Sequence, residues 1–297
     1  MDRFTKAREA ARGGPKVLLA TSVGGHHPVA LFDSLLAVAL TMAGAEVHFL
    51  LCDGALGACE HLTFQNTPDL DGFARCGVEP GVCDRCFGLC NESYSTLGLL
   101  VHRYSNWLRD EDRALARHLA EGTPFQDMAG LVLNGQRVGE HAQAGALRFF
   151  ARGELEPGAL SEAVLRRYLE GAAATSLAVN NLLRGNSFQR ACFHHGIYVP
   201  QGLVGEACRA NGVGVANWQV AYRKRSFIFS HGDTYHHTMI DEPVRVWQGM
   251  GYGPELRQKT RDYLASRITG ANDWIWFHER VQGDQAEVLR ELGLDPA

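Results

Sequence analysis

The chain lacks the long apolar runs that would place it in a membrane. None of its uninterrupted hydrophobic stretches reaches the roughly 18 residues needed to cross a bilayer. The first 14 residues are charged and contain no apolar segment of the kind found in secretory signals. We therefore expect no transmembrane segment, and a cytoplasmic protein that is either free or peripheral to the inner face of the membrane.

The chain also lacks a strong charge of either sign. Its 29 Lys and Arg residues face 33 Asp and Glu residues, which gives a formal net charge of -4. Without a global basic field, nucleic acid is not expected as the main partner. A hydrophobic content of 45% over 297 residues is typical of a globular protein that buries a sizeable core.

Several signature motifs of nucleotide and metal enzymes are missing, yet the pattern of an α/β fold is present. The sequence contains no G-x-G-x-x-G, no Walker A lysine and no H-E-x-x-H. Residues 16–22 and 46–52 read as buried strands on either side of an apolar helix over residues 29–42. Residues 92–120 read as helical, residues 128–134 as a further strand and residues 160–183 as a long helix. The predicted fold class is α/β, a Rossmann-like parallel sheet with helices on both faces, plus a Cys-rich excursion after the second strand.

The first predicted turn combines two glycines with two histidines. Gly24, Gly25, His26 and His27 follow the carboxyl end of the first strand, where open parallel sheets place ligands. The glycines fit either a tight turn that needs backbone freedom or a loop that contacts a ligand. We take His26 as a candidate catalytic residue, and Gly24, Gly25 and His27 as candidate substrate contacts.

A second group of polar residues follows later apolar segments. Residues 191–193 read as a strand that runs into His194 and His195, and residues 213–218 read as the next strand. Residues 230–237, SHGDTYHH, concentrate titratable side chains at a strand end, which favours a site over a core. The candidate catalytic residues here are His195 and Asp233, and the candidate substrate-binding residues are His194, Arg223, His231, Tyr235 and His236.

Six of the eight cysteines fall between residues 52 and 90. Cys83-x-x-Cys86 has the spacing of a metal knuckle, and Cys52 with Cys59 supplies a second pair. We predict a structural zinc ion bound by these four thiolates, with Cys76 and Cys90 in reserve. Free thiols with Cys83 and Cys86 as a redox pair, and an iron–sulfur cluster, are the alternatives.

Several segments together resemble a known family. They include K-V-L-L-A-x-S-x-G-G-H from residue 16, LLCD followed by AC and C-x-x-C, HHGIYVPQG from residue 194, FIFSHGDTYHHT from residue 227, and NDWIWFHE over residues 272–279. In these segments the chain resembles bacterial capsule and surface-polysaccharide biosynthesis proteins, which are glycosyltransferase-like proteins of the GT-B type.

The resemblance implies a function and a domain plan. Residues 1–297 would form a single acceptor-side, amino-terminal Rossmann-like domain with a Cys-rich insertion at about 52–90, while the donor-binding domain is absent. The chain would transfer a sugar from a nucleotide-sugar, supplied with a separate carboxyl-terminal donor domain, to a carbohydrate or lipid-linked acceptor. His26, His195 or Asp233 would act as general base against the acceptor hydroxyl, and Arg223 would meet a phosphate or carboxylate of the substrate.

Two other functions fit the same residues. A non-catalytic module would bind a glycan or a partner transferase domain and carry zinc only for stability. A metal-dependent hydrolase would hold a divalent ion with the histidines and the aspartate of SHGDTYHH.

Overall fold

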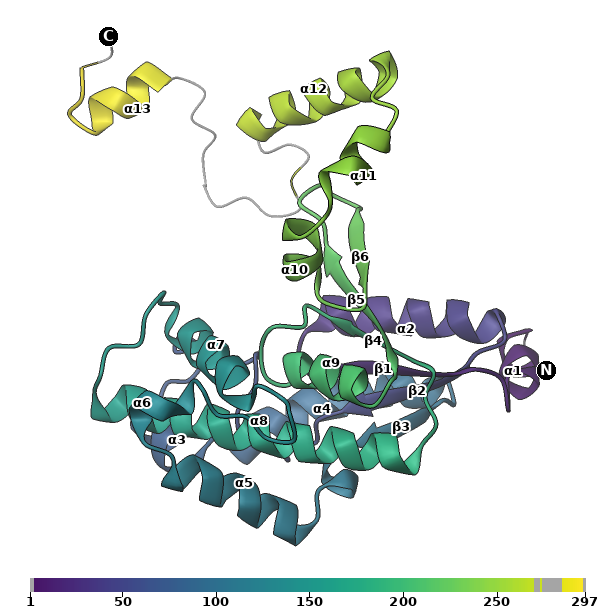
Figure 1. The fold of residues 1–297 in the computed structure, drawn as a ribbon, viewed down its shortest axis with the longest axis vertical. Helices are drawn as coiled ribbons and strands as arrows, with labels where there is room; N and C mark the ends of the chain where they lie inside the picture. The colour runs from purple at the N-terminus through teal and green to yellow at the C-terminus, as the bar shows by residue number, and fades with distance from the viewer. Residues whose placement is uncertain (1–2, 270–272, 274–284, 296–297) are drawn as a thin grey trace. The chain divides into compact units, whose positions relative to one another are not determined.

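The computed structural model describes residues 3–269, 273 and 285–295 (Figure 1). It divides into two compact units, one made of residues 1–218 and 230–234 and the other of residues 219–229 and 235–297. The NDWIWFHE segment at residues 272–279 lies outside the described residues, apart from Asp273. In the described part of the chain, no helix is both long enough and apolar enough to cross a membrane.

A six-stranded sheet has the order β3-β2-β1-β4-β5-β6. The strands are β1 (Lys16–Ser22), β2 (Glu46–Leu51), β3 (Leu100–Arg103), β4 (Arg190–His194), β5 (Gly214–Val220) and β6 (Phe227–His231). The pairs formed by β1 with β2, β1 with β4, β2 with β3 and β4 with β5 are all parallel. The strand order changes direction between β1 and β4, so the carboxyl ends of these two strands form the switch point where open α/β sheets bind ligands.

The central strands are buried on both faces. In β1, residues 17–22 are all buried, and Leu18 pairs with His48 of β2 on one side and Ala191 of β4 on the other. A continuous apolar strand of this kind is typical of a parallel sheet that has helices on both faces. The predicted Rossmann-like α/β fold is confirmed.

Within the described residues, ten helical segments precede β5. They are α1 (Arg3–Ala10), α2 (His27–Met42), α3 (Leu70–Cys76), α4 (Pro80–Thr96), the 3₁₀ helix η1 (Tyr104–Trp107), α5 (Asp110–Gly122), α6 (Phe125–Met128), α7 (Val138–Phe150), α8 (Ala159–Gly185) and α9 (Gln201–Ala210). The alanine-rich α8 packs against α5, α7 and α9 on one side of the sheet, and the buried apolar residues of its second half join the main core cluster with Leu18 and Ala191. On the other face, Tyr94 of α4 stacks on Phe49 of β2 with ring centroids 3.6 Å apart. Figure 1 shows α2 and α8 on opposite sides of the sheet.

The second unit contributes its own helices. They are α10 (Tyr235–Ile240), α11 (Val244–Gly249), α12 (Pro254–Thr269) and α13 (Gln285–Glu291). The two buried hydrophobic clusters of the described chain consist only of residues between 18 and 215, all in the first unit. The first unit therefore contains the core that holds the candidate site.

Two local predictions are wrong. Residues 128–134 form no strand, because Leu133 and Gln136 bond to each other's backbone across a turn with positive φ at Asn134 (52°) and Gly135 (75°). A strand lies instead at Leu100–Arg103, within a stretch that reads as helical in the sequence. Parallel pairing with β2, rather than local propensity, makes that segment extended.

Candidate functional site

Both strands at the switch point lead into a non-glycine residue in the left-handed region of the backbone. Ser22 at the end of β1 has φ of 58°, and His195 directly after β4 has φ of 66°. The conformation of His195 is fixed on both sides, since its N–H donates to the Trp218 carbonyl at 3.1 Å and its carbonyl accepts from Thr234 Oγ1 at 2.8 Å. Such backbone conformations are uncommon outside glycine and concentrate at functional sites.

The glycines after β1 permit close approach rather than a left-handed turn, because neither has a positive φ. A Cβ at Gly24 would lie 2.3 Å from the carbonyl oxygen of Cys86, and a Cβ at Gly25 would lie 2.7 Å from Nε2 of His61. The interpretation that these glycines supply backbone freedom is therefore wrong, since their role is to let α4 and the His61 ring approach the turn. The loop still lies at the carboxyl end of β1, as a ligand-contacting loop would.

Six side chains from four segments of the chain meet beside this turn. We call them the switch-point cluster: His26, Glu60, His61, Arg148, Tyr198 and Gln201. The rings of His26 and His61 lie 5.1 Å apart, and the guanidinium carbon of Arg148 lies 5.4 Å from the centre of the Tyr198 ring. Gln201 Nε2 donates to a carboxylate oxygen of Glu60 at 2.6 Å. The cluster thus combines an acid, two imidazoles and a cation at the carboxyl edge of β1 and β4.

Glu60 is the buried acid of the cluster, with 4% of its surface exposed. Its backbone N–H donates to the Val199 carbonyl at 2.8 Å, which attaches it to the segment after β4. Burial raises the pKa of Glu60 to about 7, although the charge of Arg148 and the hydrogen bond from Gln201 lower it. A carboxyl group with this pKa exchanges its proton near neutral pH.

The two imidazoles are held in the neutral form. Burial lowers the pKa of His26 to about 4, with further lowering by His61 and Arg148. Burial also lowers the pKa of His61, and Arg148 adds to that effect. Neutral imidazoles can accept as well as donate hydrogen bonds at physiological pH.

Two polar atoms of the cluster are buried with their hydrogen-bonding capacity unused. Among residues 3–269, neither Nη1 of Arg148 nor Oε1 of Gln201 has a hydrogen-bond partner. Buried polar atoms are nearly always paired, and an exception needs an explanation. A substrate that presents an anionic oxygen to Arg148 and a donor to Gln201 would pair both.

A second buried carboxyl lies behind the cluster, in α2. Asp33 is fully buried and accepts from Thr21 Oγ1 at 2.7 Å and from Trp218 Nε1 at 2.9 Å. Burial raises its pKa to about 7, while both hydrogen bonds lower it. The carbonyl of Thr21 also accepts from Gln201 Nε2 at 3.3 Å. Asp33 thus connects the ends of β1 and β5 through Thr21 and Trp218. The carbonyl of Thr21 extends this network to Gln201, which donates to Glu60.

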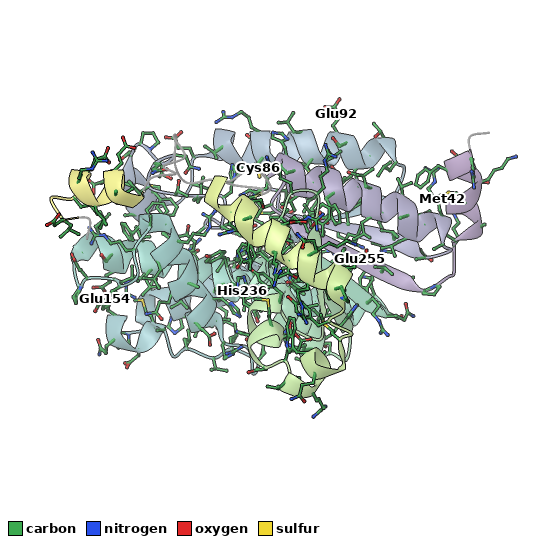
Figure 2. The ribbon with its side chains drawn as sticks, turned by 90° about the horizontal axis from the view of Figure 1, so that it is seen from above. Met42, Cys86, Glu92, Glu154, His236 and Glu255 are labelled. Carbon is green, nitrogen blue, oxygen red and sulfur yellow. The ribbon has the colours of Figure 1, made fainter. Side chains whose placement is uncertain are left out.

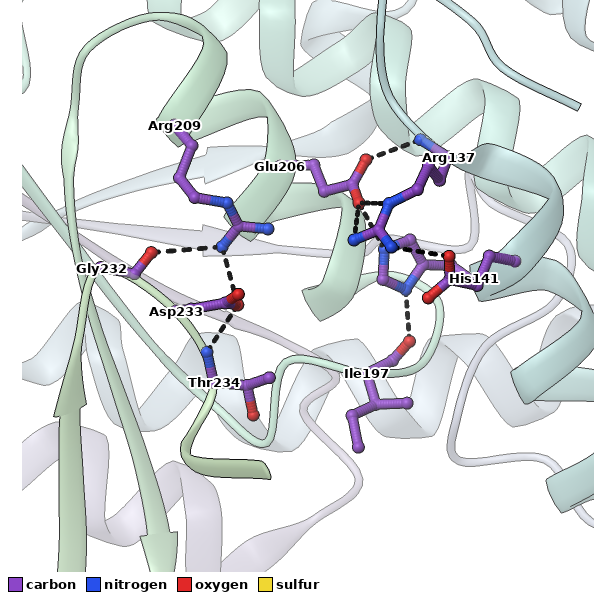
Figure 3. Close-up of polar contacts among 9 residues, drawn as sticks. Arg137, His141, Ile197, Glu206, Arg209, Gly232, Asp233 and Thr234 are labelled. Atoms are coloured by element: carbon purple, nitrogen blue, oxygen red, sulfur yellow. Dashed lines mark hydrogen bonds and ion pairs between the residues drawn. The ribbon is translucent and has the colours of Figure 1, made fainter. Parts of the chain in front are cut away.

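A third acid connects α7 to α9 (Figure 3). Glu206 accepts from the backbone and side chain of Arg137 at 2.6 and 2.8 Å, and His141 Nε2 lies 3.3 Å away. Burial raises the pKa of Glu206, but the hydrogen bonds from His141 and Arg137 outweigh it and bring the value to about 2. Because α7 carries Arg148, this ionised contact fixes the helix that supplies the cation of the cluster.

The predicted catalytic residues lie at the carboxyl ends of different strands. His26 is the N-cap of α2 and belongs to the switch-point cluster, and the ring of His195 lies 4.9 Å from that of Tyr198. Asp233 accepts from Arg209 Nη1 at 3.2 Å and from the N–H of Thr234 at 2.7 Å (Figure 3). Thr234 in turn bonds to His195, so the chain brings Asp233 and His195 near each other. Their catalytic roles remain predictions.

The predicted substrate-binding residues divide between the two units. In the first, His27 is exposed at the start of α2, the His194 ring lies 4.7 Å from Trp218, and His231 is exposed at the end of β6. In the second unit lie Arg223, which pairs with Asp273 in an isolated bridge, and Tyr235 and His236, whose rings lie 3.9 Å apart. The SHGDTYHH segment thus belongs partly to each unit.

Five residues of the cluster are not among the predicted site residues: Glu60, His61, Arg148, Tyr198 and Gln201. Some of them stand beside predicted site residues in the sequence. Glu60 and His61 directly follow Cys59, and Gln201 stands in the same short segment as His194 and His195. Nothing in the sequence shows that a residue of α7 reaches the switch point, because that proximity depends on how α7 packs on α8 and α9.

The four predicted zinc ligands line one small pocket of about 20 Å³ together with His61. Nevertheless, within the described residues no group of three or more His, Cys, Asp or Glu side chains is placed to hold a metal ion. Backbone N–H groups already donate to the sulfurs of Cys52, Cys59 and Cys86, and burial raises the pKa of Cys52 to about 12 and of Cys83 to about 11. The predicted structural zinc is wrong, and the eight cysteines are free thiols.

Comparisons with known proteins find similarity among solved structures but not among family models or curated proteins. No protein-family model and no curated protein matches the chain. A crystal structure of cyclo(L-leucyl-L-phenylalanyl) synthase is similar at 11% sequence identity, with a TM-score of 0.34 over 67% of this chain and 85% of that chain. The structure of CDPS from Staphylococcus haemolyticus is similar at 11% identity, with a TM-score of 0.37 over 77% of this chain and 97% of that chain.

These findings overturn the resemblance to capsule and surface-polysaccharide biosynthesis proteins. The two solved structures described above are cyclodipeptide synthases rather than glycosyltransferases. The predicted GT-B glycosyltransferase, its nucleotide-sugar donor, and the alternatives of a glycan-binding or partner-binding module and a metal-dependent hydrolase are therefore wrong. Two of the motifs behind them, HHGIYVPQG and FIFSHGDTYHHT, lie at the ends of β4 and β6, and one α/β scaffold supports many chemistries at those positions. The chain is an α/β protein with a Rossmann-like sheet, and its chemistry has to be read from its own switch-point cluster.

Proposed function

We propose that this chain is an enzyme that binds a small anionic substrate at the carboxyl ends of β1 and β4 and transfers a proton to or from it through Glu60. The observation that carries the proposal is a buried carboxyl with a pKa of about 7 beside a cation whose Nη1 is buried and lacks a hydrogen-bond partner among residues 3–269. Titratable groups perturbed in this way mark functional sites more often than structural ones.

Arg148 supports the choice of an anionic substrate. Its guanidinium lies against Tyr198 on one side, which leaves Nη1 available to a carboxylate or phosphate oxygen. The 16-residue helix α2 begins at His27, and the partial positive charge of a helix N-terminus also favours an anion there. Both effects favour an anionic group at this edge of the sheet.

Glu60 and His26 have complementary acid–base properties. With a pKa of about 7, Glu60 is present in both forms at neutral pH, which is optimal for a general acid or base. His26 stays neutral and can accept a hydrogen bond from the substrate. In enzymes, two neighbouring groups take acid and base roles when their environments move their pKa values apart.

Binding is tested with inorganic phosphate and a series of short carboxylates as probes, using the thermal unfolding midpoint of the full chain. We expect stabilisation of the wild type and its loss in Arg148→Met. Arg152→Met is the matched control, because Arg152 lies four residues further on and is held by an exposed ion pair with Glu156. Equal stabilisation of both variants would show that the probes bind elsewhere.

Proton transfer is tested by incubating the chain with a library of small anionic metabolites in D₂O and detecting turnover or deuterium incorporation by mass spectrometry. Cyclic-dipeptide formation is assayed beside these reactions and would narrow the substrate if the chain performs it. Glu60→Gln should lose activity by about 10²-fold or more, as expected for a lost general acid or base, while Arg152→Met keeps it. NMR of ¹³C-labelled glutamate gives an independent answer: titration of Glu60 near its ordinary pKa would refute the proposal.

A further inference from the structure

The cysteine-lined pocket contains a pair of thiols that the proposed function does not use. Cys52 and Cys59 come from the segment after β2, and Cys83 and Cys86 come from the first half of α4. We propose that Cys83 and Cys86 form a thiol–disulfide exchange site whose oxidation changes the Gly24–Gly25 turn. This inference does not depend on the acid–base function of Glu60.

Helical geometry places the Cys83 and Cys86 side chains within reach of each other. Residues three apart on a helix have Cβ atoms about 5–6 Å apart, and a disulfide requires about 3.5–4.5 Å. A local tightening of one turn of α4 therefore brings Cys83 and Cys86 together. A bond from α4 to Cys52 would have to break the contacts of the Cys52 sulfur with the backbone N–H groups of Gly54 and Leu56.

Cys86 connects α4 to the Gly24–Gly25 turn. The N–H of Gly25 donates to the Cys86 sulfur at 3.0 Å, and the carbonyl oxygen of Cys86 would lie 2.3 Å from a Cβ at Gly24. With the backbone this close, a shift of the helical turn at Cys86 displaces the glycine turn, and the next residue in the chain is His26. Figure 2 labels Cys86 on α4.

The chemistry uses a small disulfide, such as oxidised glutathione, as the oxidant. The thiolate of one cysteine attacks the disulfide, forms a mixed disulfide with one glutathione and releases the other as a thiolate. The second cysteine then attacks the protein sulfur of the mixed disulfide, which closes the Cys83–Cys86 bond and releases the second glutathione. Two electrons pass to the oxidant, and the two thiol protons protonate the released glutathione thiolates.

The test treats the full chain with oxidised glutathione and maps its cysteines by peptide mass spectrometry. We expect the peptide containing Cys83 and Cys86 to lose two hydrogen atoms and to regain them with a reductant. Cys83→Ser and Cys86→Ser should each stop at a mixed disulfide or remain unmodified. Cys52→Ser should still form the bond. Exposed Cys76 reacts without forming an internal bond, so Cys76→Ser is the matched control.

The effect of oxidation on the Gly24–Gly25 turn is measured separately, from the ¹⁵N-histidine NMR signals of His26 before and after oxidation. We expect these signals to shift in the wild type and in Cys76→Ser but not in Cys83→Ser. A bond that joins α4 to Cys52 or Cys59, or no internal disulfide at all, would refute the site. A Cys83–Cys86 bond that leaves the His26 signals unchanged would refute its effect on the turn.

Discussion

The three most buried carboxyls near the site show how environment decides the charge of a side chain. Glu60 and Asp33 have pKa values raised to about 7 because burial outweighs their hydrogen bonds. Glu206 is also buried, yet its pKa falls to about 2 because His141 and Arg137 stabilise its ionised form. Burial raises the pKa of an acid, whereas charge-assisted hydrogen bonds lower it. We therefore expect substitutions of Glu60 and Glu206 to have opposite pH dependences of stability.

Glu60→Gln should gain stability relative to the wild type as the pH rises. Glu60 has a folded pKa raised to about 7 from its usual value of 4.5, so its ionisation costs stability progressively from about pH 4.5 to pH 7. Glutamine has no such cost, and the difference between variant and wild type should shift by up to about 3 kcal/mol between pH 4.5 and pH 8. Chemical denaturation at the two pH values measures it.

The control is Glu92→Gln, at an exposed position on α4 (Figure 2). Its difference from the wild type should be the same at both pH values. If Glu60→Gln behaves like Glu92→Gln, the pKa of Glu60 is not raised in the folded state, and its proposed role as a proton donor fails.

Glu206→Gln should have the opposite pH dependence. Its folded pKa is depressed to about 2, so the stability contributed by the carboxylate is present above pH 4.5 and is lost as the pH falls through 2. We expect a loss of roughly 1–3 kcal/mol at pH 7, because Arg137 and His141 lose a charged partner. The loss should be smaller at pH 3. Urea denaturation at pH 7 and pH 3 measures it.

Glu140→Gln is the matched control for that substitution. Glu140 pairs with the same Arg137 at 2.8 Å, but its side chain is 50% exposed. An exposed ion pair contributes only about 0–1 kcal/mol. Equal effects at the two positions would mean that the Glu206 contact is not buried in solution.

At the scale of whole elements, close helix packing depends on single glycines. Gly145 of α7 faces Tyr168 of α8, and a Cβ at Gly145 would lie 2.4 Å from Cδ1 of the tyrosine ring. Tyr168 is fully buried and its hydroxyl donates to the Cys59 carbonyl at 3.1 Å, so the ring has little room to move. The position of α7, and with it Arg148, depends on this contact.

Gly145→Ala should therefore destabilise the chain by about 1–3 kcal/mol through overpacking. Gly88→Ala is the matched control, because Gly88 is an exposed residue of α4 with nothing within 4 Å of an added Cβ. The control should gain roughly 0.5–1 kcal/mol from helix propensity. A stabilising Gly145→Ala, measured by urea denaturation, would show that the two helices are further apart than 2.4 Å implies.

The elements differ in how far the sequence predicts them. The strand at residues 16–22 and the helix at residues 160–183 follow from long apolar patterns, which burial on both faces requires. Leu100–Arg103 has only four residues, and its extended form depends on pairing with β2. A local sequence pattern does not show whether a partner strand is available. For the same reason, the apolar run at residues 128–134 reads as a strand although it forms none.

At the scale of the whole molecule, the first compact unit should fold without the chain that follows it. Both buried clusters lie between residues 18 and 215, and the first unit ends at residue 234. A chain of residues 1–234 should unfold cooperatively, with a midpoint within about 4 °C of the full chain, the shift that about 1 kcal/mol produces at this size. Circular dichroism during heating measures it, and a broad, non-cooperative transition would contradict the prediction.

The α/β class, the first βαβ unit, and the placement of His26 and His195 after strands follow from the sequence alone, because periodic burial and the order of elements along the chain are enough to predict them. Which side chains meet depends on the three-dimensional packing. Glu60, Arg148 and Gln201 come from segments far apart in sequence, and their contacts depend on how α7, α8 and α9 pack. Likewise, cysteine spacing alone indicated a metal, whereas the packed backbone donates hydrogen bonds to those sulfurs. The local sequence pattern shows which faces of a helix or strand are buried. The distance between two such faces depends on the packing of the whole core.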